Sequence, residues 1–343
     1  MKDKGGMAVL TGISLFCVAV FALAGYGIFR ESNPGLPVSV RQITLSPAQQ
    51  PAKPSAPQES TETTAQAEES GESVPAAAEP ILGKIVEEFM NPFHASYESY
   101  NRVSVKNRSG YALDLQEILG TNPALKIQKN DQPQVLIVHT HTTECYMNRD
   151  ADSYTEADAT RSENPDENTV SIGEEFARVL RENGIATVHD PTVHDSPAYT
   201  GSYARSRQTV LRNLEEYPSI RVIIDLHRDS VSLNDTDKVK PVVEIEGQKT
   251  AQVMLVMGCG EEIAGYENWK QNFGFAAKYQ QTMAVLYPGL ARAICLVNCA
   301  YNQDLSPGFI LLEVGTEANS HEEAVRAAQF SARALASFLN TLQ

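Results

Sequence analysis

Short apolar runs alternate with helical repeats over the C-terminal two thirds of the chain. Runs rich in β-branched residues at 134–140, 185–190 and 221–229 are typical of buried strands. The segments between them, 168–184 and 203–217, place their apolar residues at a helical period, and Gly184 stands where the first of these helices should end. Strands that alternate with helices predict an α/β fold with a mostly parallel, twisted sheet flanked by helices.

The same alternation continues to the C-terminus. Four further strands are predicted at 241–247, 251–258, 291–302 and 308–316, the first two as a candidate hairpin. Helices are predicted at 268–287 and 320–342, and Ser320 and Glu323 form a capping box at the start of the second. Because no repeat is evident, we predict one folded domain over residues 95–343.

The N-terminal pattern is different, because residues 6–29 carry no charge. A membrane-spanning helix needs about 20 such residues. Lys2 and Lys4 precede the run, which favours a cytoplasmic N-terminus and an extracytoplasmic remainder. The alternative is a cleaved signal peptide, whose apolar core is usually only about 7–15 residues long. We therefore expect residues 1–30 to form a cytoplasmic tip and a single transmembrane anchor in the cell membrane.

Residues 31–94 are rich in Pro, Ala, Gln, Ser, Thr and Glu. Such a composition buries too little apolar surface to offset the entropy of ordering the chain. We expect a disordered, solvated linker here, with 79–100 as a candidate short helix at the edge of the folded part.

Charge and cysteine content narrow the class of protein. The net charge of −15 and the pI of about 4.9 argue against a protein that binds nucleic acid through its phosphates. The spacing of Cys295 and Cys299 lacks the paired CxxC pattern of a structural zinc site, and small apolar packing is favoured over a disulfide.

Polar residues follow three of the predicted strands. The first strand ends in His139-Thr140-His141, the third carries His227 and the last carries Glu313. If these strands are neighbours and parallel, their carboxyl ends meet at one edge of the sheet. Imidazole nitrogens combined with a carboxylate oxygen are the ligands of catalytic Zn²⁺.

The spacing His141-x-x-Glu144 lets two side chains face one ion after a turn, and His227 would supply the third ligand. A glutamate outside the ligand set is then needed to take a proton from the attacking water, and Glu313 is the candidate. His139 is an alternative ligand or a core histidine bonded to the backbone. We expect at most one of His139 and His141 to be a direct ligand, with the other orienting it or packing below it.

Several other residues carry weaker hypotheses. Glu163 and Glu167 precede the first helix and are alternatives to Glu144 as the carboxylate ligand. Arg205 and Arg207 are candidates for clamping a substrate carboxylate, although helix arginines are often merely solvated. Cys145 as a nucleophile has no supporting motif around it.

Four motifs occur in order and cover most of residues 133–320: HTHTTECY, GIATVHDPTVHDSPAYTGSYARSRQTV, IIDLHRDS and LLEVGTEANS. By these motifs the chain resembles the stage II sporulation protein P family, membrane-anchored cell-wall hydrolases of endospore-forming bacteria. The resemblance implies the fold of the zinc-dependent amidases, which are similar to zinc carboxypeptidases. It also implies N-acetylmuramoyl-L-alanine amidase action on peptidoglycan during engulfment, with endopeptidase action as well.

The resemblance implies roles for individual residues. His141 or His139, together with His227, would bind zinc, and Glu313 would be the catalytic acid and base. Related amidases use a glutamate just before the first helix, which favours Glu163 or Glu167, whereas the carboxypeptidase-like spacing favours Glu144.

The implied partners are the stage II D and M sporulation proteins. Two alternative functions stay open: a zinc carboxypeptidase or endopeptidase on wall peptides with the same ligands, and a non-catalytic wall-binding scaffold. The intact pattern of two histidines and a glutamate argues against the scaffold, because a binding module needs no open metal site.

Overall fold

The computed structural model describes residues 79–343, except residues 124, 262, 264 and 268. The predicted anchor and most of the predicted linker lie outside the described residues. Within the described part of the chain, no helix combines the length and the apolar character that crossing a bilayer requires.

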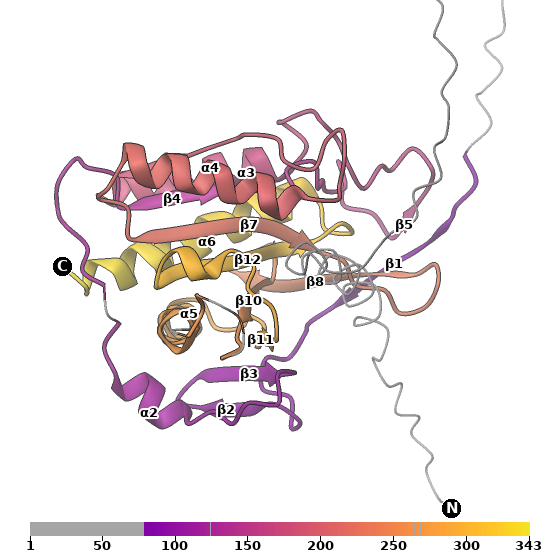
Figure 1. The fold of residues 1–343 in the computed structure, drawn as a ribbon. Helices are drawn as coiled ribbons and strands as arrows, with labels where there is room; N and C mark the ends of the chain where they lie inside the picture. The colour runs from indigo at the N-terminus through magenta and orange to yellow at the C-terminus, as the bar shows by residue number, and fades with distance from the viewer. Residues whose placement is uncertain (1–78, 124, 262, 264, 268) are drawn as a thin grey trace, which may run out of the picture. The chain divides into compact units, whose positions relative to one another are not determined.

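The larger of two sheets has eight strands in the order β2-β3-β11-β10-β12-β7-β4-β6 (Figure 1). Their bounds are Glu98–Tyr100 (β2), Val103–Asn107 (β3), Val135–Val138 (β4), Thr187–His189 (β6), Val222–Asp229 (β7), Val253–Gly258 (β10), Ile294–Val297 (β11) and Gly308–Thr316 (β12). Every neighbouring pair is parallel except β10–β12 and β2–β3. The predicted mixed α/β fold with a mostly parallel sheet is therefore confirmed.

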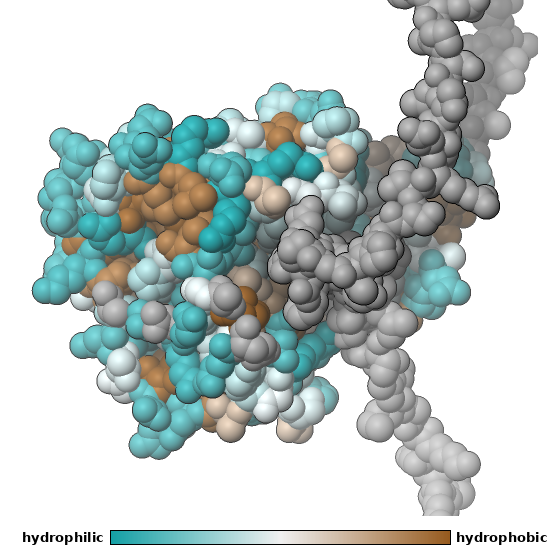
Figure 2. All heavy atoms as spheres, viewed as in Figure 1, coloured by the Kyte–Doolittle hydropathy of each residue, from teal (hydrophilic) through white to brown (hydrophobic). Residues whose placement is uncertain are grey.

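Helices cover both faces of this sheet. They are α2 (Leu115–Gly120), α3 (Thr169–Glu182), α4 (Ser202–Glu216), α5 (Trp269–Leu286) and α6 (His321–Asn340). Val135 and Ile137 of β4 belong to the main core with Phe176 of α3, whereas Leu136 and Val138 pack in a separate cluster with Val210 of α4. Because successive strand residues point to opposite faces, α3 and α4 lie on opposite sides of the sheet. On the face seen in Figure 2, polar residues dominate and apolar residues gather in a few patches.

Local signals in the sequence account for the ends of two helices. The side chain of Asn168 caps α3, and Gly184 follows it with φ of 79°. The capping box of Ser320 and Glu323 at the start of α6 is confirmed.

The smaller sheet has the order β5-β1-β8-β9, from Ser153–Tyr154 (β5), Gly83–Glu88 (β1), Lys238–Ile245 (β8) and Gln248–Ala251 (β9). It corrects the prediction of a helix at 79–100, where β1 and β2 form instead. β1 pairs in parallel with β8, far along the chain, so the partner that stabilises it is invisible to local pattern. Residues 83–88, which the prediction assigned to the linker, are therefore part of the folded domain.

The predicted hairpin between 241–247 and 251–258 is also wrong. β8 turns back through Glu246 and Gly247, both with positive φ, and pairs with the short β9. β10 then enters the larger sheet between β11 and β12. Two adjacent apolar runs thus belong to different sheets.

Candidate active site

The three strands that carry the predicted site residues are neighbours. β7 lies between β4 and β12, and all three run parallel. From β4 the chain crosses to β6 on one side and then to β7 on the other, which makes a topological switch point. Such points place side chains from several strand ends around one crevice.

His139 and His141 lie on different sides of the sheet. His139 is fully buried on the α3 face, where its Nδ1–H donates to the Leu226 carbonyl at 3.0 Å and its Nε2 lies 2.9 Å from Nε2 of His189. A Cβ at Gly173 of α3 would come within 2.6 Å of the His139 ring, so a glycine is required there. Burial lowers the pKa of His139 to about 3. His139 is thus a core histidine, separated from the residues described next.

His141 lies on the other side, among aromatic rings. Its ring stacks on Tyr199, with centroids 4.3 Å apart and planes 9° from parallel, and meets His227 edge to face at 5.3 Å. Its Nδ1 lies 3.4 Å from the Ser202 hydroxyl. Burial lowers the pKa of His141 to about 4, so the ring is neutral and able to act as a ligand at physiological pH.

His227 lies between two carboxylates, one at each of its ring nitrogens. Its Nδ1 lies 3.5 Å from Glu144 Oε2, and its Nε2 lies 3.0 Å from Asp225 Oδ1. Within the described residues this buried Nε2 makes an ion-pair contact with Asp225 and no hydrogen bond. Burial opposes protonation of His227, yet Asp225 and Glu144 together hold its pKa well above the usual value.

Asp225 orients His227, and the predictions missed it. Its carboxylate accepts from the Thr140 amide at 2.8 Å and from the Thr140 hydroxyl at 2.6 Å, and the residue is fully buried. Residues two apart on a strand share a face, so the acid two positions before a candidate ligand was a usable signal. A carboxylate behind a histidine fixes the ring, as in many metal sites.

Glu144 remains ionised despite its burial. Burial disfavours its charge, but the Arg228 guanidinium and His227 outweigh this and hold its pKa far below the usual range. The Arg228 amide donates to Glu144 Oε2 at 3.3 Å, and the Arg228 side chain donates to the carbonyls of Cys145 and Thr160 at 3.2 and 2.7 Å. Arg228 therefore ties the loop that carries Glu144 to β7, a role that the sequence motifs did not predict.

Glu313 lies directly beside His227 in the register of β12 and β7. The pairing shifts after Glu313, where Gly315 has φ of 64°, and bulges of this kind re-aim side chains next to active sites. The buried Oε2 of Glu313 finds no hydrogen-bond partner among the described residues. Burial, with the charge of Asp229, raises the pKa of Glu313 to about 8. A carboxyl with a pKa near neutrality is suited to general acid–base catalysis.

The two alternative carboxylate ligands are engaged elsewhere. Glu163 is exposed and accepts from the Ser196 hydroxyl, while Glu167 is exposed and accepts from Ser162 at 2.8 Å and Asn164 at 2.9 Å. Of the three glutamates considered as ligands, Glu144 is the one that the structure brings to His227.

The two arginines proposed as a substrate clamp hold the protein itself. Arg205 donates to the carbonyls of His194, Thr200 and Ala198. Arg207 forms a bidentate pair with Asp304 at 2.9 and 2.6 Å. Substrate binding by either stays a prediction, and these contacts argue against it.

The donor set of His141, Glu144 and His227 fits zinc in its chemistry, since it offers two imidazoles and an ionised carboxylate. Because His227 Nε2 faces Asp225 at 3.0 Å, Nδ1, which lies 3.5 Å from Glu144 Oε2, is the nitrogen that could reach an ion shared with Glu144. As they stand, however, no three His, Cys, Asp or Glu side chains of the described chain are arranged to hold an ion.

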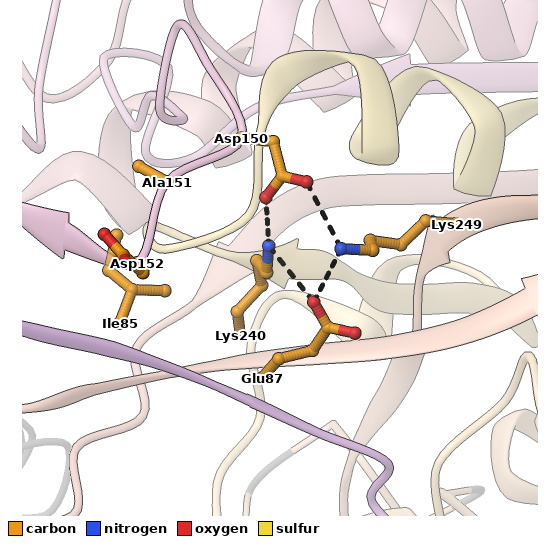
Figure 3. A pocket seen from close by; sticks show the side chains of 7 residues that line it. All are labelled: Ile85, Glu87, Asp150, Ala151, Asp152, Lys240 and Lys249. Atoms are coloured by element: carbon orange, nitrogen blue, oxygen red, sulfur yellow. Dashed lines mark hydrogen bonds and ion pairs between the residues drawn. The ribbon is translucent and has the colours of Figure 1, made fainter.

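A cavity of about 360 Å³ shares no lining residue with this site. Figure 3 shows its ion pairs, in which Lys240 and Lys249 alternate with Asp150 and Glu87. Outside this view, Lys240 Nζ also lies 3.4 Å from Oε1 of the buried Glu323 of α6. These contacts join the smaller sheet to α6 and to the loop containing Asp150, which is a structural role.

Fold and site together define an α/β protein with paired histidines and glutamates at the carboxyl ends of adjacent parallel strands. The model of the family described as stage II sporulation protein P matches residues 36–336. The chain belongs to this family.

The stage II sporulation protein P of Bacillus subtilis (strain 168) is 32% identical over 213 residues, which cover 59% of this chain and 50% of that protein. The chain thus spans about half the length of this curated relative.

Among solved structures, the amidase AmiC2 of Nostoc punctiforme is 12% identical, with 62% of this chain and 99% of that chain covered and a TM-score of 0.33. The N-acetylmuramoyl-L-alanine amidase of Clostridium difficile 630 is 13% identical, with 62% and 100% covered and a TM-score of 0.32.

Proposed function

We propose that the chain is a peptidoglycan hydrolase that cleaves the amide between N-acetylmuramic acid and L-alanine of the stem peptide during sporulation. The observation that carries this is the convergence of His141, Glu144 and His227 beside Glu313, a carboxyl with a raised pKa. Membership of a sporulation family supports the biological setting.

Glu313 is the proton carrier in this proposal. It accepts a proton from the attacking water as the carbon–oxygen bond forms, and it donates that proton to the leaving nitrogen as the carbon–nitrogen bond breaks. Asp225 keeps the His227 ring in place, and Arg228 keeps Glu144 ionised. His141, Glu144 and His227 would hold zinc, which when bound polarises the scissile carbonyl and lowers the pKa of water.

The same residues would serve the cleavage of peptide crosslinks, so endopeptidase or carboxypeptidase action is the second candidate. We also propose that residues 6–29 anchor the protein in the cell membrane with the folded domain outside. Stage II D and M proteins are the expected companions.

Mass spectrometry of purified peptidoglycan after digestion by the full-length protein tests the bond. We expect free stem peptides that begin with L-alanine and glycan strands that keep intact muramic acid. Glu313→Gln should lose about 10²–10⁴ in rate while keeping its metal. Matched controls are Glu163→Gln and Glu167→Gln, which should keep both metal and activity.

Products cut only between peptides would replace the amidase by an endopeptidase. An absence of any product, with wild type and Glu313→Gln alike, would contradict the hydrolase proposal.

A further inference from the structure

Two consecutive residues near the candidate active site have a left-handed backbone. Tyr301 has φ of 47° and Asn302 has φ of 58°. Asparagine tolerates this region, but for a bulky residue such as tyrosine it is strained, and strain of this kind collects at functional sites. The other described non-glycine residues with positive φ lie in the hairpin turns at 101–102 and 246–247, where tight turns demand it. The turn at Tyr301 joins β11 to β12, which are not paired, so hairpin geometry does not explain it.

The surrounding structure holds this turn in place. The Asn302 side-chain Nδ2–H donates to the Tyr203 carbonyl of α4 at 2.9 Å. The Gln303 side chain bonds the backbone of β10 through both its ends at 2.9 Å, and Asp304 takes the bidentate pair from Arg207. Side chains of three successive residues thus fix the segment that follows Tyr301.

The consequence is a fixed position for the Tyr301 ring. Its centroid lies 5.7 Å from that of Tyr203. The Tyr203 ring in turn meets His141 edge to face at 5.6 Å and lies within 16° of parallel to His227 at 6.5 Å. Tyr203 and Tyr301 are both half-buried. The two rings therefore form an aromatic wall that reaches from the paired histidines to the protein surface.

We propose that Tyr203 and Tyr301 form an aromatic subsite for the pyranose ring of the sugar acid on one side of the scissile amide, with Tyr301 as the residue that determines specificity. This inference rests on the proposed function. A pyranose presents a flat face of C–H groups, and aromatic rings bind flat apolar surfaces through a large contact area. On the other side of the amide stands L-alanine, whose methyl group is too small to cover two rings.

The test measures binding of the full-length protein carrying Glu313→Gln, so that turnover is suppressed. Two probes are compared: an N-acetylmuramyl tripeptide, and the same tripeptide with an acetyl group in place of the sugar. Tyr301→Leu should weaken binding of the sugar probe about tenfold, equivalent to about 1.4 kcal/mol, and leave binding of the acetyl probe unchanged. Tyr301→Phe should match the parent with both probes, because the ring and not the hydroxyl makes the contact.

A second variant separates binding from packing. Tyr301→Asn suits the left-handed backbone, so its unfolding midpoint should equal or exceed that of the parent while sugar-selective binding is lost. An equal loss of binding affinity for both probes would overturn the subsite and make Tyr301 a packing residue. A lowered unfolding midpoint together with lost binding of the sugar probe would do the same. A parent protein that shows no preference for the sugar probe would overturn it as well.

Turnover provides the separate test of the proposed function. Sugar-selective binding in a protein that cleaves no wall amide would leave the subsite standing and refute the hydrolase.

Discussion

Glu313 and Glu144 occupy one site, yet replacing each with glutamine should change stability in opposite directions. In the metal-free protein the pKa of Glu313 is raised from 4.5 to about 8 by burial and by Asp229. At pH 7 the unfolded chain therefore has an ionised glutamate where the folded chain has a mostly protonated one. Each pKa unit corresponds to about 1.36 kcal/mol, so the 2.5 units between 4.5 and pH 7 cost the wild type roughly 3 kcal/mol of folding free energy.

The sign follows from proton binding. Between pH 4.5 and 8 the folded state binds more protons at Glu313 than the unfolded state does, so this contribution to stability is lost as the pH rises. The glutamine side chain of the Glu313→Gln variant cannot ionise, so the variant does not lose this stability as the pH rises. It should be more stable than wild type by up to roughly 3 kcal/mol at pH 7, and the difference should vanish near pH 4.5.

Glu144→Gln is the matched control. The pKa of Glu144 is held low by Arg228 and His227 against the effect of burial, so its contribution is present above the unfolded pKa and is lost as the pH falls. Removing this charge takes one counter-charge from each of the two buried cations, while Asp225 stays 3.0 Å from His227 and Glu317 stays 3.5 Å from Arg228. The fold should therefore be destabilised by about 1–3 kcal/mol.

Urea unfolding of the full-length protein with EDTA, at several pH values between 4.5 and 8, measures both effects. A destabilised Glu313→Gln variant at pH 7, or a stability difference that does not change with pH, would refute the electrostatic account of Glu313.

Three further predictions concern other groups. His227→Ala should abolish zinc binding measured by atomic absorption, whereas His139→Ala should retain it despite a lowered unfolding temperature; equal loss in both would place the metal elsewhere. Asp225→Asn should lower kcat by about 10-fold or more, because the His227 ring is held less firmly while the fold persists. An unchanged kcat would contradict the orienting role of Asp225. Lys240→Met should cost about 3–5 kcal/mol of unfolding free energy because it strands the buried Glu323, whereas the half-exposed Lys249→Met should cost about 1 kcal/mol or less. Equal costs in urea unfolding would contradict the structural role of this ion-pair cluster.

Local sequence patterns predicted many of the strands and helices of this protein and part of its candidate active site. Apolar runs with β-branched residues located β4, β7 and β12, since burial on both faces of a sheet requires them. The periodic helices and the capping box of α6 followed from short-range hydrogen bonding and burial on one face. The position of His141, His227 and Glu313 after or within those strands was enough to predict that they would meet.

Tertiary structure decided the rest, because strand pairing and burial depend on residues distant in the chain. Whether β1 is a strand is settled by β8, and whether Glu144 or an acid before α3 reaches His227 is settled by how Arg228 anchors the loop. His139 packs against Gly173 and contacts His189 on the α3 face of the sheet, so His141 is the histidine of this pair that lies in the candidate active site. The raised pKa of Glu313 likewise cannot be predicted from a motif, because it arises where the fold buries the carboxyl near Asp229 and leaves its Oε2 without a hydrogen-bond partner among the described residues.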